Sequence, residues 1–311
     1  MNINLNHLRT FFFCGKHRTF SEAAEALFLS TPAVTMQMKQ LEASLGIDLF
    51  LRHRNSIALT DTGLMILEYA RKIFELAEAV ENTIEEIKAL KIGDLRVGTL
   101  RIYAGYIMPS LIASYQEKYP GVHVLLDEGG ATEIARSIIE NKNELGLIPA
   151  TDPVHPQLQL TPCFQEELVL ILPRGHHLCQ KREICIADLA REPLLLRQRG
   201  TSSREFIFEK FREAGIEPHI ITETKNVPFI IEQVQAGKGI TLMPKSPLKE
   251  LIKYRPLEVR SLAEDPILIN INIVYLKNRV LSPAAQAFME LLLENRHNPN
   301  GGIVHQKIGI D

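Results

Sequence analysis

The segment from Ser30 to Gly46 carries hydroxyl, amine and apolar groups at helical spacing. Apolar residues recur along one side of it and predict a buried helix face: Val34, Met38, Leu41 and Leu45. Ser30 is placed to cap the helix, and Gly46 is placed to end it. The other side offers groups that could hydrogen-bond a ligand or touch it with apolar atoms: Thr31, Pro32, Thr35, Met36, Lys39 and Gln40. Ordinary solvated surface could look the same, so the neighbouring elements must decide.

Another concentration of reactive side chains lies at 175–185, where GHHLCQKREIC places two histidines and two cysteines close together. Such side chains can bind zinc or form a thiol switch, but the spacing matches no common structural zinc pattern. We interpret them as loop residues without a metal role, with a Cys179–Cys185 switch as a minor alternative. The remaining Ser, His and Asp residues form no nucleophile elbow or metal constellation, so nothing supports catalysis or a cofactor.

The first 60 residues contain the elements that must position the 30–46 segment. Residues 5–17 predict a helix with Leu5, Leu8, Phe12 and Phe13 on one side. Residues 19–28 predict a second helix, with Thr19 and Glu22 as a capping box and Ala23, Ala24, Leu27 and Phe28 buried. Only Leu29 and Ser30 separate it from the next helix, which is typical of a helix-turn-helix. The following residues 47–60 predict a short β-ribbon, or wing, with a basic tip: Arg52, His53, Arg54 and Asn55.

Residues 60–91 predict one long helix. Its apolar residues approximate a heptad seam: Leu67, Ala70, Phe74, Ala77, Val80, Ile84 and Ile87, continued by Lys91 and with Glu81 as an alternative to Val80. The seam could pack on the chain's own domain. The other faces are strongly charged and no partner helix follows, so we favour pairing with a second copy, through Leu67, Phe74, Val80, Ile84 and Ile87.

Beyond Gly93 the pattern alternates between strands and amphipathic helices, which predicts a mainly parallel α/β sheet with covered faces. The expected strands are 95–100, 122–127, 144–149, 167–173, 219–223, 239–244 and 268–276. The expected helices are 107–119, 132–142, 203–215 and 227–237. The size favours two subdomains, about 92–164 with 267–297 and about 165–266, and a fraying tail at 298–311.

Composition sets the remaining bounds. The chain has 311 residues, 45% hydrophobic and 23% charged, with a formal net charge of −2. That balance gives no whole-chain signature of nucleic-acid binding, although a basic surface can be confined to one module. We find no signal peptide, no apolar stretch long enough for a membrane span, and no disulfide framework among the four cysteines, which indicates a cytoplasmic protein.

Residues 17–63 resemble the winged helix-turn-helix of LysR-type transcriptional regulators. The resemblance rests on matching residues along the whole segment: Ala23-Ala24, Ser30, Pro32-Ala33-Val34, Leu41-Glu42, Leu45-Gly46, Leu49-Phe50, Arg52, Leu59-Thr60 and Gly63. The order of the remaining segments is also similar, and the resemblance covers nearly all of residues 5–297. It implies a winged helix-turn-helix at 1–59, a linker and dimerisation helix at 60–91, and a periplasmic-binding-protein-like α/β effector domain at 92–297.

The resemblance implies that the 30–46 helix enters the DNA major groove with its N-terminal end toward the bases. Thr31 and Thr35 would then bond base edges or phosphates, and Pro32 and Met36 would contact thymine methyls. Lys39, Arg52 and Arg54 would hold phosphates. The chain departs from the family at two of these positions, since the family usually has glutamine at the position of Thr31 and a wing arginine at that of Asn55.

The resemblance also implies an effector cleft between the two α/β subdomains, where strand ends meet helix N-termini. The turns that would line it contribute Leu100, Arg101, Ile102, Gly130, Ala131, Pro149, Thr201, Ser202 and Ser203. The family commonly has Ser or Thr where Leu100, Arg101 and Ile102 stand. Arg101 could bind a carboxylate, sulfate or phosphate there, or could point outward as a surface cation. The 201–203 hydroxyls could cap a helix, although the family's turn favours ligand contact.

These inferences predict a ligand-responsive regulator without enzymatic activity. It would bind an inverted-repeat promoter site as a homodimer or homotetramer and respond to a small anionic effector. RNA polymerase is a further candidate partner. The alternatives are a redox-sensing regulator using Cys163, Cys179 or Cys185, and a solute-binding receptor, which would need an export signal and no DNA-binding module.

Overall fold

The computed structural model describes residues 3–17, 19–51, 58–150, 154–263 and 266–295. The chain divides into two compact units, Met1–Glu86 and Ile87–Asp311, here called the N-terminal and C-terminal units. Four helices precede the first strand: α1 (Leu5–Lys16), α2 (Phe20–Ala26), α3 (Thr31–Leu45) and α4 (Asp61–Lys88). The predicted wing tip, including Arg52, Arg54 and Asn55, and the predicted tail at 298–311 lie outside the described residues.

Helix α3 has the bounds and the buried stripe that its sequence predicts. The Ser30 hydroxyl accepts a hydrogen bond from the Ala33 N–H, and Gly46 ends the helix with a φ of 70°. Val34, Met38 and Leu41 are buried in the core of the N-terminal unit. Phe50 and Leu59 form an antiparallel bridge, so the chain on either side of the wing tip is paired as a ribbon requires.

Two predictions about helix faces are wrong. In α1, Leu5 is exposed and Phe11 is fully buried, because the buried face is turned by one position from the predicted one. Helix α2 ends at Ala26, and Phe28 adopts a positive φ of 53° in the turn. This conformation directs the Phe28 side chain away from the core and into solvent, and the residue is 96% exposed.

The predicted seam of α4 is divided between two environments. Ala70 is buried and Phe74 stacks on Phe12 of α1 with ring centroids 5.4 Å apart. Leu67 also packs against this core. The first half of the seam therefore packs within its own unit, as the alternative interpretation had it, whereas Val80, Ile84 and Ile87 are exposed on the chain.

The C-terminal unit contains the remaining elements. In chain order, they are β1 (Gly93–Leu100), α5 (Arg101–Tyr106), α6 (Met108–Lys118), β2 (Val122–Gly129), α7 (Ala131–Ile139), β3 (Leu145–Pro149), β4 (Leu158–Pro173), η1 (His177–Gln180), η2 (Ile186–Leu189), β5 (Leu194–Arg197), α8 (Ser202–Glu213), β6 (Ile220–Thr224), α9 (Val227–Gln235), β7 (Thr241–Pro244), α10 (Leu248–Leu251), β8 (Leu257–Arg260), β9 (Ile267–Leu276) and α11 (Pro283–Glu294).

The main sheet is mixed, which corrects the expectation of a mainly parallel one. Its strand order is β2-β1-β3-β9-β4-β7, with β8 also paired to β4. Strands β1, β2 and β3 are parallel, but β9 runs antiparallel to β3 and β4, and β4 runs antiparallel to β7 and β8. Parallel strands β5 and β6 form a separate small sheet. The difference arises because β4 and β9 are the two strands that cross between the lobes.

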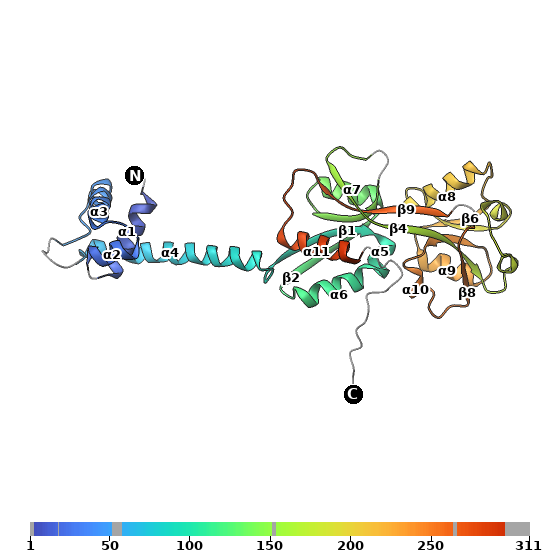
Figure 1. The fold of residues 1–311 in the computed structure, drawn as a ribbon, viewed down its shortest axis with the longest axis horizontal. Coiled ribbons are helices and arrows are strands. Elements are labelled where there is room, and N and C mark those ends of the chain that lie inside the picture. The colour runs from blue at the N-terminus through green and yellow to red at the C-terminus, as the bar shows by residue number, and fades with distance from the viewer. Residues whose placement is uncertain (1–2, 18, 52–57, 151–153, 264–265, 296–311) are drawn as a thin grey trace, which may run out of the picture. The chain divides into compact units, whose positions relative to one another are not determined.

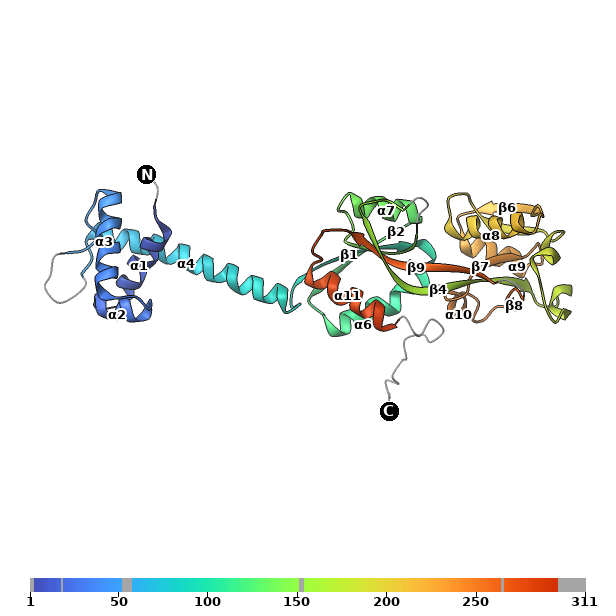
Figure 2. The same cartoon turned by 45° about the horizontal axis from the view of Figure 1, so that its top comes forward.

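Strands β4 and β9 lie side by side and run through both lobes of the C-terminal unit (Figure 1; Figure 2). One lobe carries α5, α6, α7 and α11 around β1, β2 and β3, and the other carries α8, α9 and α10. One large apolar core includes residues of both lobes, such as Leu95, Tyr115 and Phe288 in the first and Leu195 and Ile230 in the second. This packing fixes the strand ends that face each other between the lobes.

Candidate functional site

The exposed side of α3 forms a shallow, open depression. It is lined by the five residues of this helix that the family resemblance assigns to DNA contact, and not by Gln40: Thr31, Pro32, Thr35, Met36 and Lys39. The Thr35 hydroxyl donates a hydrogen bond of 2.9 Å to the Thr31 carbonyl oxygen. Met36 is an exposed apolar side chain beside them. The surface thus combines hydroxyl, apolar and cationic groups within reach of a ligand on one helix.

A second surface, in the C-terminal unit, is a cavity of about 230 Å³ at the carboxyl ends of several strands. Its walls come from both lobes: Leu100, Arg101, Ile102, Tyr103, Gly129, Gly130, Thr132, Glu133, Pro149, Ile269 and Ile271, and across from them Arg197, Arg199, Gly200, Thr201, Ser203, Lys225 and Pro244. Ligands of α/β proteins bind at such strand ends. The fold therefore brings residues far apart in sequence into one site.

Most of the predicted effector residues line this cavity. Of the nine, Ala131 does not: it is buried in the first turn of α7 and packs in the core instead. The neighbouring Thr132 takes its place in the wall. The Ser202 side chain lies outside the described residues. Arg101 lines the cavity, with its guanidinium 3.5 Å from a Glu133 carboxylate oxygen.

The hydroxyl of Thr201 does not cap α8. It donates a hydrogen bond of 2.9 Å to the Gln198 carbonyl oxygen, and the Thr201 side chain accepts no hydrogen bond from the N–H groups that begin this helix. By contrast, Glu133 accepts the Gly130 N–H at the start of α7, which holds the pKa of its carboxyl below the ordinary value, with help from Arg101. Helix α7 thus has a carboxylate, that of Glu133, at its N-terminal end. The N-cap residue of α8, Thr201, lines the cavity and carries no carboxylate.

The cavity has a strong excess of positive charge. Four cations line it, Arg101, Arg197, Arg199 and Lys225, against the single carboxylate of Glu133. Burial, and then the charge of Arg101, lower the pKa of Arg197. Among the described residues, the Arg197 Nε is the one buried side-chain nitrogen or oxygen without a hydrogen-bond partner. A buried donor without a partner is costly, so the site is electrostatically prepared for an anion.

The wall also contains a residue held by a buried hydrogen-bond network. Tyr103 donates to Glu166 over 3.1 Å, and the other carboxylate oxygen of Glu166 accepts from the Ser246 N–H and hydroxyl. Burial raises the pKa of Glu166, against the effect of these hydrogen bonds, and raises that of Tyr103 well above its ordinary value. The network connects Tyr103 of α5 in one lobe to Ser246, the second residue after β7, in the other.

Sequence reasoning missed several lining residues, notably Tyr103, Glu133, Arg197 and Lys225. A signal for two of them was present: Arg197 ends a strand whose apolar run LLL precedes it, and Lys225 follows the predicted strand at 219–223. The rule that selected the other turns, ligand contact at strand ends, would have found both.

Two domain descriptions of one family match the chain, one over each of the two surfaces. Residues 5–64 match the bacterial regulatory helix-turn-helix protein of the lysR family, and residues 88–296 match the LysR substrate binding domain. The chain belongs to the LysR family. It is a DNA-binding transcriptional regulator with an effector-binding domain, in a family of regulators rather than enzymes. No helix in the described ranges is sufficiently long and apolar to span a membrane.

Relatives align over almost the full chain. The RuBisCO operon transcriptional regulator of Allochromatium vinosum is 29% identical over 294 residues, covering 94% of this chain and 96% of the relative. The regulator CbbR of Rhizobium meliloti is 31% identical over 296 residues, covering 94% and 93%. Full-length OxyR from Pseudomonas aeruginosa has the same fold, with a TM-score of 0.78 at 23% identity, covering 95% of this chain and 100% of OxyR. CbnR in complex with its target DNA has a TM-score of 0.64 at 24% identity, covering 94% of this chain and 99% of CbnR.

Proposed function

We propose that this LysR family regulator binds an inverted-repeat promoter site through α3 and is switched by a small anionic effector in the cavity of its C-terminal unit. The observation that carries the proposal is the cavity wall of four cations and one carboxylate, with the Arg197 Nε left unpartnered. The volume of about 230 Å³ suits a compact molecule. A carboxylate, sulfate or phosphate group would accept bidentate hydrogen bonds from the arginines.

The proposed switch depends on both lobes contributing cations. Arg101 lies on the lobe of β1, whereas Arg197, Arg199 and Lys225 lie on the other. An anion bound by both groups favours the lobe arrangement in which they converge. Its effect on the equilibrium is limited to its differential affinity for the two arrangements, typically about 1–3 kcal/mol.

DNA contact is proposed for Thr31, Pro32, Thr35, Met36 and Lys39, with Arg52, Arg54 and Asn55 as wing contacts. The support is that the first five line one depression on the recognition helix of a helix-turn-helix unit. Short side chains at Thr31 and Thr35 allow close approach to base edges, and Lys39 supplies a phosphate contact.

Pairing of two copies is proposed along the exposed apolar residues of α4. These follow three-and-four spacing: Met65, Tyr69, Ile73, Leu76, Val80, Ile84 and Ile87. They replace Leu67 and Phe74, which pack within the N-terminal unit. We expect Val80→Glu to shift the sedimentation of the protein to a smaller species, and Glu78→Gln to leave it unchanged. A tetramer of two such pairs, RNA polymerase as a partner and a cytoplasmic location complete the proposal.

The DNA part is tested by fluorescence anisotropy with the duplex upstream of the chain's own gene, over a salt series. Saturable binding that only specific competitor displaces, and that Thr35→Ala weakens, supports the proposal. Ser44→Ala is the matched control, since its hydroxyl also bonds a helix carbonyl of α3 but lies outside the depression. Equal loss in both variants, or binding indifferent to sequence at every tested promoter, would contradict base contact by Thr35.

The effector part is tested by the thermal stabilisation that citrate, sulfate and inorganic phosphate give to wild-type protein and to Arg101→Ala. We expect at least one anion to stabilise wild-type protein and Arg101→Ala to weaken its binding about tenfold or more. If Arg101→Ala stays folded and its anion affinity is unchanged, the proposal that the cavity binds the anion is wrong. The DNA assay does not depend on that result.

A further inference from the structure

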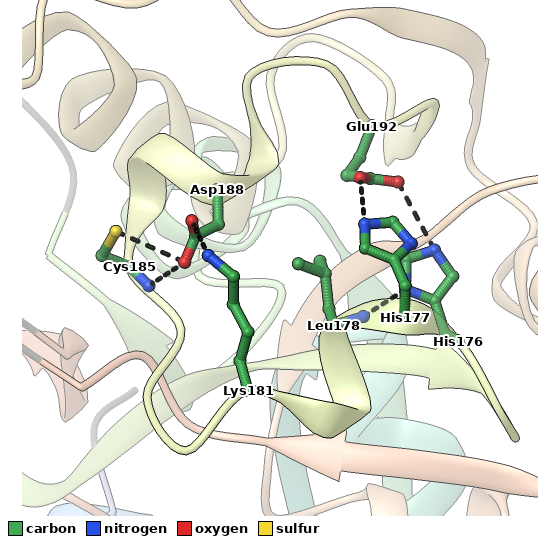
Figure 3. A network of polar contacts seen from close by, with 7 residues as sticks. All are labelled: His176, His177, Leu178, Lys181, Cys185, Asp188 and Glu192. Carbon is green, nitrogen blue, oxygen red and sulfur yellow. Dashed lines mark hydrogen bonds and ion pairs between the residues drawn. The ribbon is translucent and has the colours of Figure 1, made fainter.

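The segment 175–192 contains a group of possible metal ligands that is separate from both surfaces described above. It comprises His176 at the start of η1, His177 in its first position, and Glu192 after η2 (Figure 3). Their ligand atoms all lie within 4.8 Å of one another. Two of the three belong to the GHHLCQKREIC motif, and the third lies seven residues beyond its end.

We propose that His176, His177 and Glu192 form a binding site for a divalent transition-metal ion of the Zn²⁺ class. Both imidazole Nε2 atoms point at the same carboxylate: His176 Nε2 is 3.4 Å from Glu192 Oε2, and His177 Nε2 is 3.0 Å from Oε1. Zinc bonds of about 2.0–2.1 Å in tetrahedral geometry separate neighbouring ligand atoms by about 3.3 Å. Both observed nitrogen–oxygen separations are close to that value. They involve different oxygens of Glu192, so the carboxylate presents one oxygen to each imidazole.

The chemistry of the donor set selects the class of ion. Two imidazole nitrogens with one carboxylate oxygen suit zinc, copper, nickel or cobalt, whereas magnesium and calcium prefer oxygen ligands throughout. Three protein ligands leave a fourth tetrahedral position for water or for an external ligand. Among the described residues, this is the one group of three or more histidine, cysteine or acidic side chains close enough to share an ion.

Burial makes the site more than a chance surface contact. The side chains of His176 and Glu192 are 16% and 13% exposed, whereas that of His177 is 66% exposed. The centroids of the two imidazole rings are 4.4 Å apart and the rings are inclined at 32°, so the exposed His177 lies against the more buried His176. The exposed His177 can adjust its position as an ion enters, and the two inner ligands are already fixed.

Neighbouring contacts hold the two turns that carry the ligands. Asp188 of η2 forms an ion pair with Lys181, which follows η1, and accepts hydrogen bonds from the N–H and thiol of Cys185 (Figure 3). Arg260 of β8 donates to three backbone carbonyl oxygens at 179–182. Cys185 thus bonds to Asp188, and the thiol does not join the histidines.

One contact opposes the ion and limits its affinity. The Leu178 N–H points at His176 Nδ1 over 3.3 Å, which places the ring proton on Nε2 in the metal-free protein. A metal at Nε2 moves that proton to Nδ1 and displaces this long hydrogen bond. The site is therefore expected to bind the ion reversibly, and binding should perturb the backbone amide of Leu178.

The test is titration of the untagged, chelator-treated full-length protein with Co²⁺, followed by its visible absorption, and with Zn²⁺ by calorimetry. We expect one equivalent to bind, and Glu192→Gln or His177→Gln to weaken binding at least tenfold, since each removes one ligand. His177→Gln is the safer variant for folding because the side chain is exposed. His123→Gln is the matched control, because His123 forms an exposed pair with Asp94 that offers only two ligands.

The possible outcomes separate a site from non-specific binding by the ten histidines of the chain. The proposal is supported if wild-type protein and His123→Gln bind one equivalent of the metal ion, and Glu192→Gln and His177→Gln lose it. No binding, or binding that survives both Glu192→Gln and His177→Gln, overturns it. Loss in His123→Gln alone would place the bound ion elsewhere and would also overturn it.

Discussion

The depression on α3 and the cavity of the C-terminal unit are both suited to negatively charged ligands, but they are built in opposite ways. The depression is open, lies on one helix, and includes a single cation, Lys39. The cavity is assembled from strand ends of two lobes and includes four cations, one of them with a buried, unpartnered nitrogen. A long polymer supplies many contacts and tolerates weak ones, whereas a small ligand must be bound by a few groups that the fold has desolvated in advance.

The largest expected effect concerns the packing of α4 against Leu49 and Leu59, the residues on either side of the wing tip. A Cβ at Gly63 would lie 2.2 Å from the Leu49 carbonyl oxygen, so Gly63→Ala must displace backbone and should destabilise the N-terminal unit by about 3 kcal/mol. Gly105→Ala in α5 meets no atom within 4 Å and should stabilise the C-terminal unit by about 0.5–1 kcal/mol. Denaturant unfolding followed by circular dichroism measures both, with DNA binding as the report on the N-terminal unit. Equal effects of the two substitutions would contradict this contrast.

The next effect concerns Arg197, whose burial is expected to favour anion binding and to reduce the stability of the free protein. Arg197→Met should weaken binding of whichever anion stabilises the wild-type protein by about 10-fold or more, because charged hydrogen bonds contribute about 1.5–3 kcal/mol. The same change removes a buried unpaired donor, so the free protein should unfold at an equal or higher temperature. Arg212→Met on the exposed surface of α8 is the control for both measurements. A large loss of stability without loss of anion binding would mean that Arg197 is structural.

A smaller effect is expected at the cation of the open surface. Lys39→Ala should reduce the slope of log affinity against log salt by about 0.9 for each recognition helix bound, and weaken specific and non-specific DNA alike. The measurement is anisotropy at several salt concentrations on cognate and unrelated duplexes. A loss confined to the cognate duplex would indicate base contact by Lys39 rather than phosphate contact.

The smallest effect concerns pH and the buried carboxyl behind Tyr103. Burial raises the pKa of Glu166 in the folded protein, so its stabilising contribution is complete below the ordinary pKa of 4.5 and declines as the pH rises through the raised value. Glu166→Gln keeps an acceptor for Ser246 and cannot ionise. We expect the melting temperature of wild-type protein to fall relative to that of Glu166→Gln as the pH rises from 4.5 to neutrality. A constant difference would contradict this linkage.

Local signals predicted the open surface well, because a single helix carries it. Helix α3 begins and ends at the predicted residues, and its five selected side chains share one depression. The cavity was predicted only in part: Arg101 and Thr201 line it, but Ala131 is turned into the core, and Arg197 was missed with its short strand β5. Such errors are physical, since one position along a helix rotates a side chain by about 100° and a four-residue strand has little periodicity.

Long-range pairing accounts for the remaining differences. Periodicity located β9 and residues 167–173 of β4, but it missed residues 158–166 of β4. It also could not give the direction of either strand, which depends on how the chain crosses between lobes. It also could not divide the seam of α4, because Leu67 and Phe74 are seven residues apart, as are Val80 and Ile87. Contact with Phe12, which is far away in sequence, decides which residues are already occupied.

The internal hydrogen bond of Thr35 restricts what this side chain can recognise. Its hydroxyl proton is committed to the Thr31 carbonyl oxygen, so an approaching base pair meets oxygen lone pairs and a methyl group, but no free donor. Guanine presents acceptors to the major groove, whereas adenine and cytosine present amino groups and thymine presents a methyl group. For the base contact proposed for Thr35, the edge opposite it is therefore expected to be an adenine or cytosine amino group or a thymine methyl, with guanine selected against.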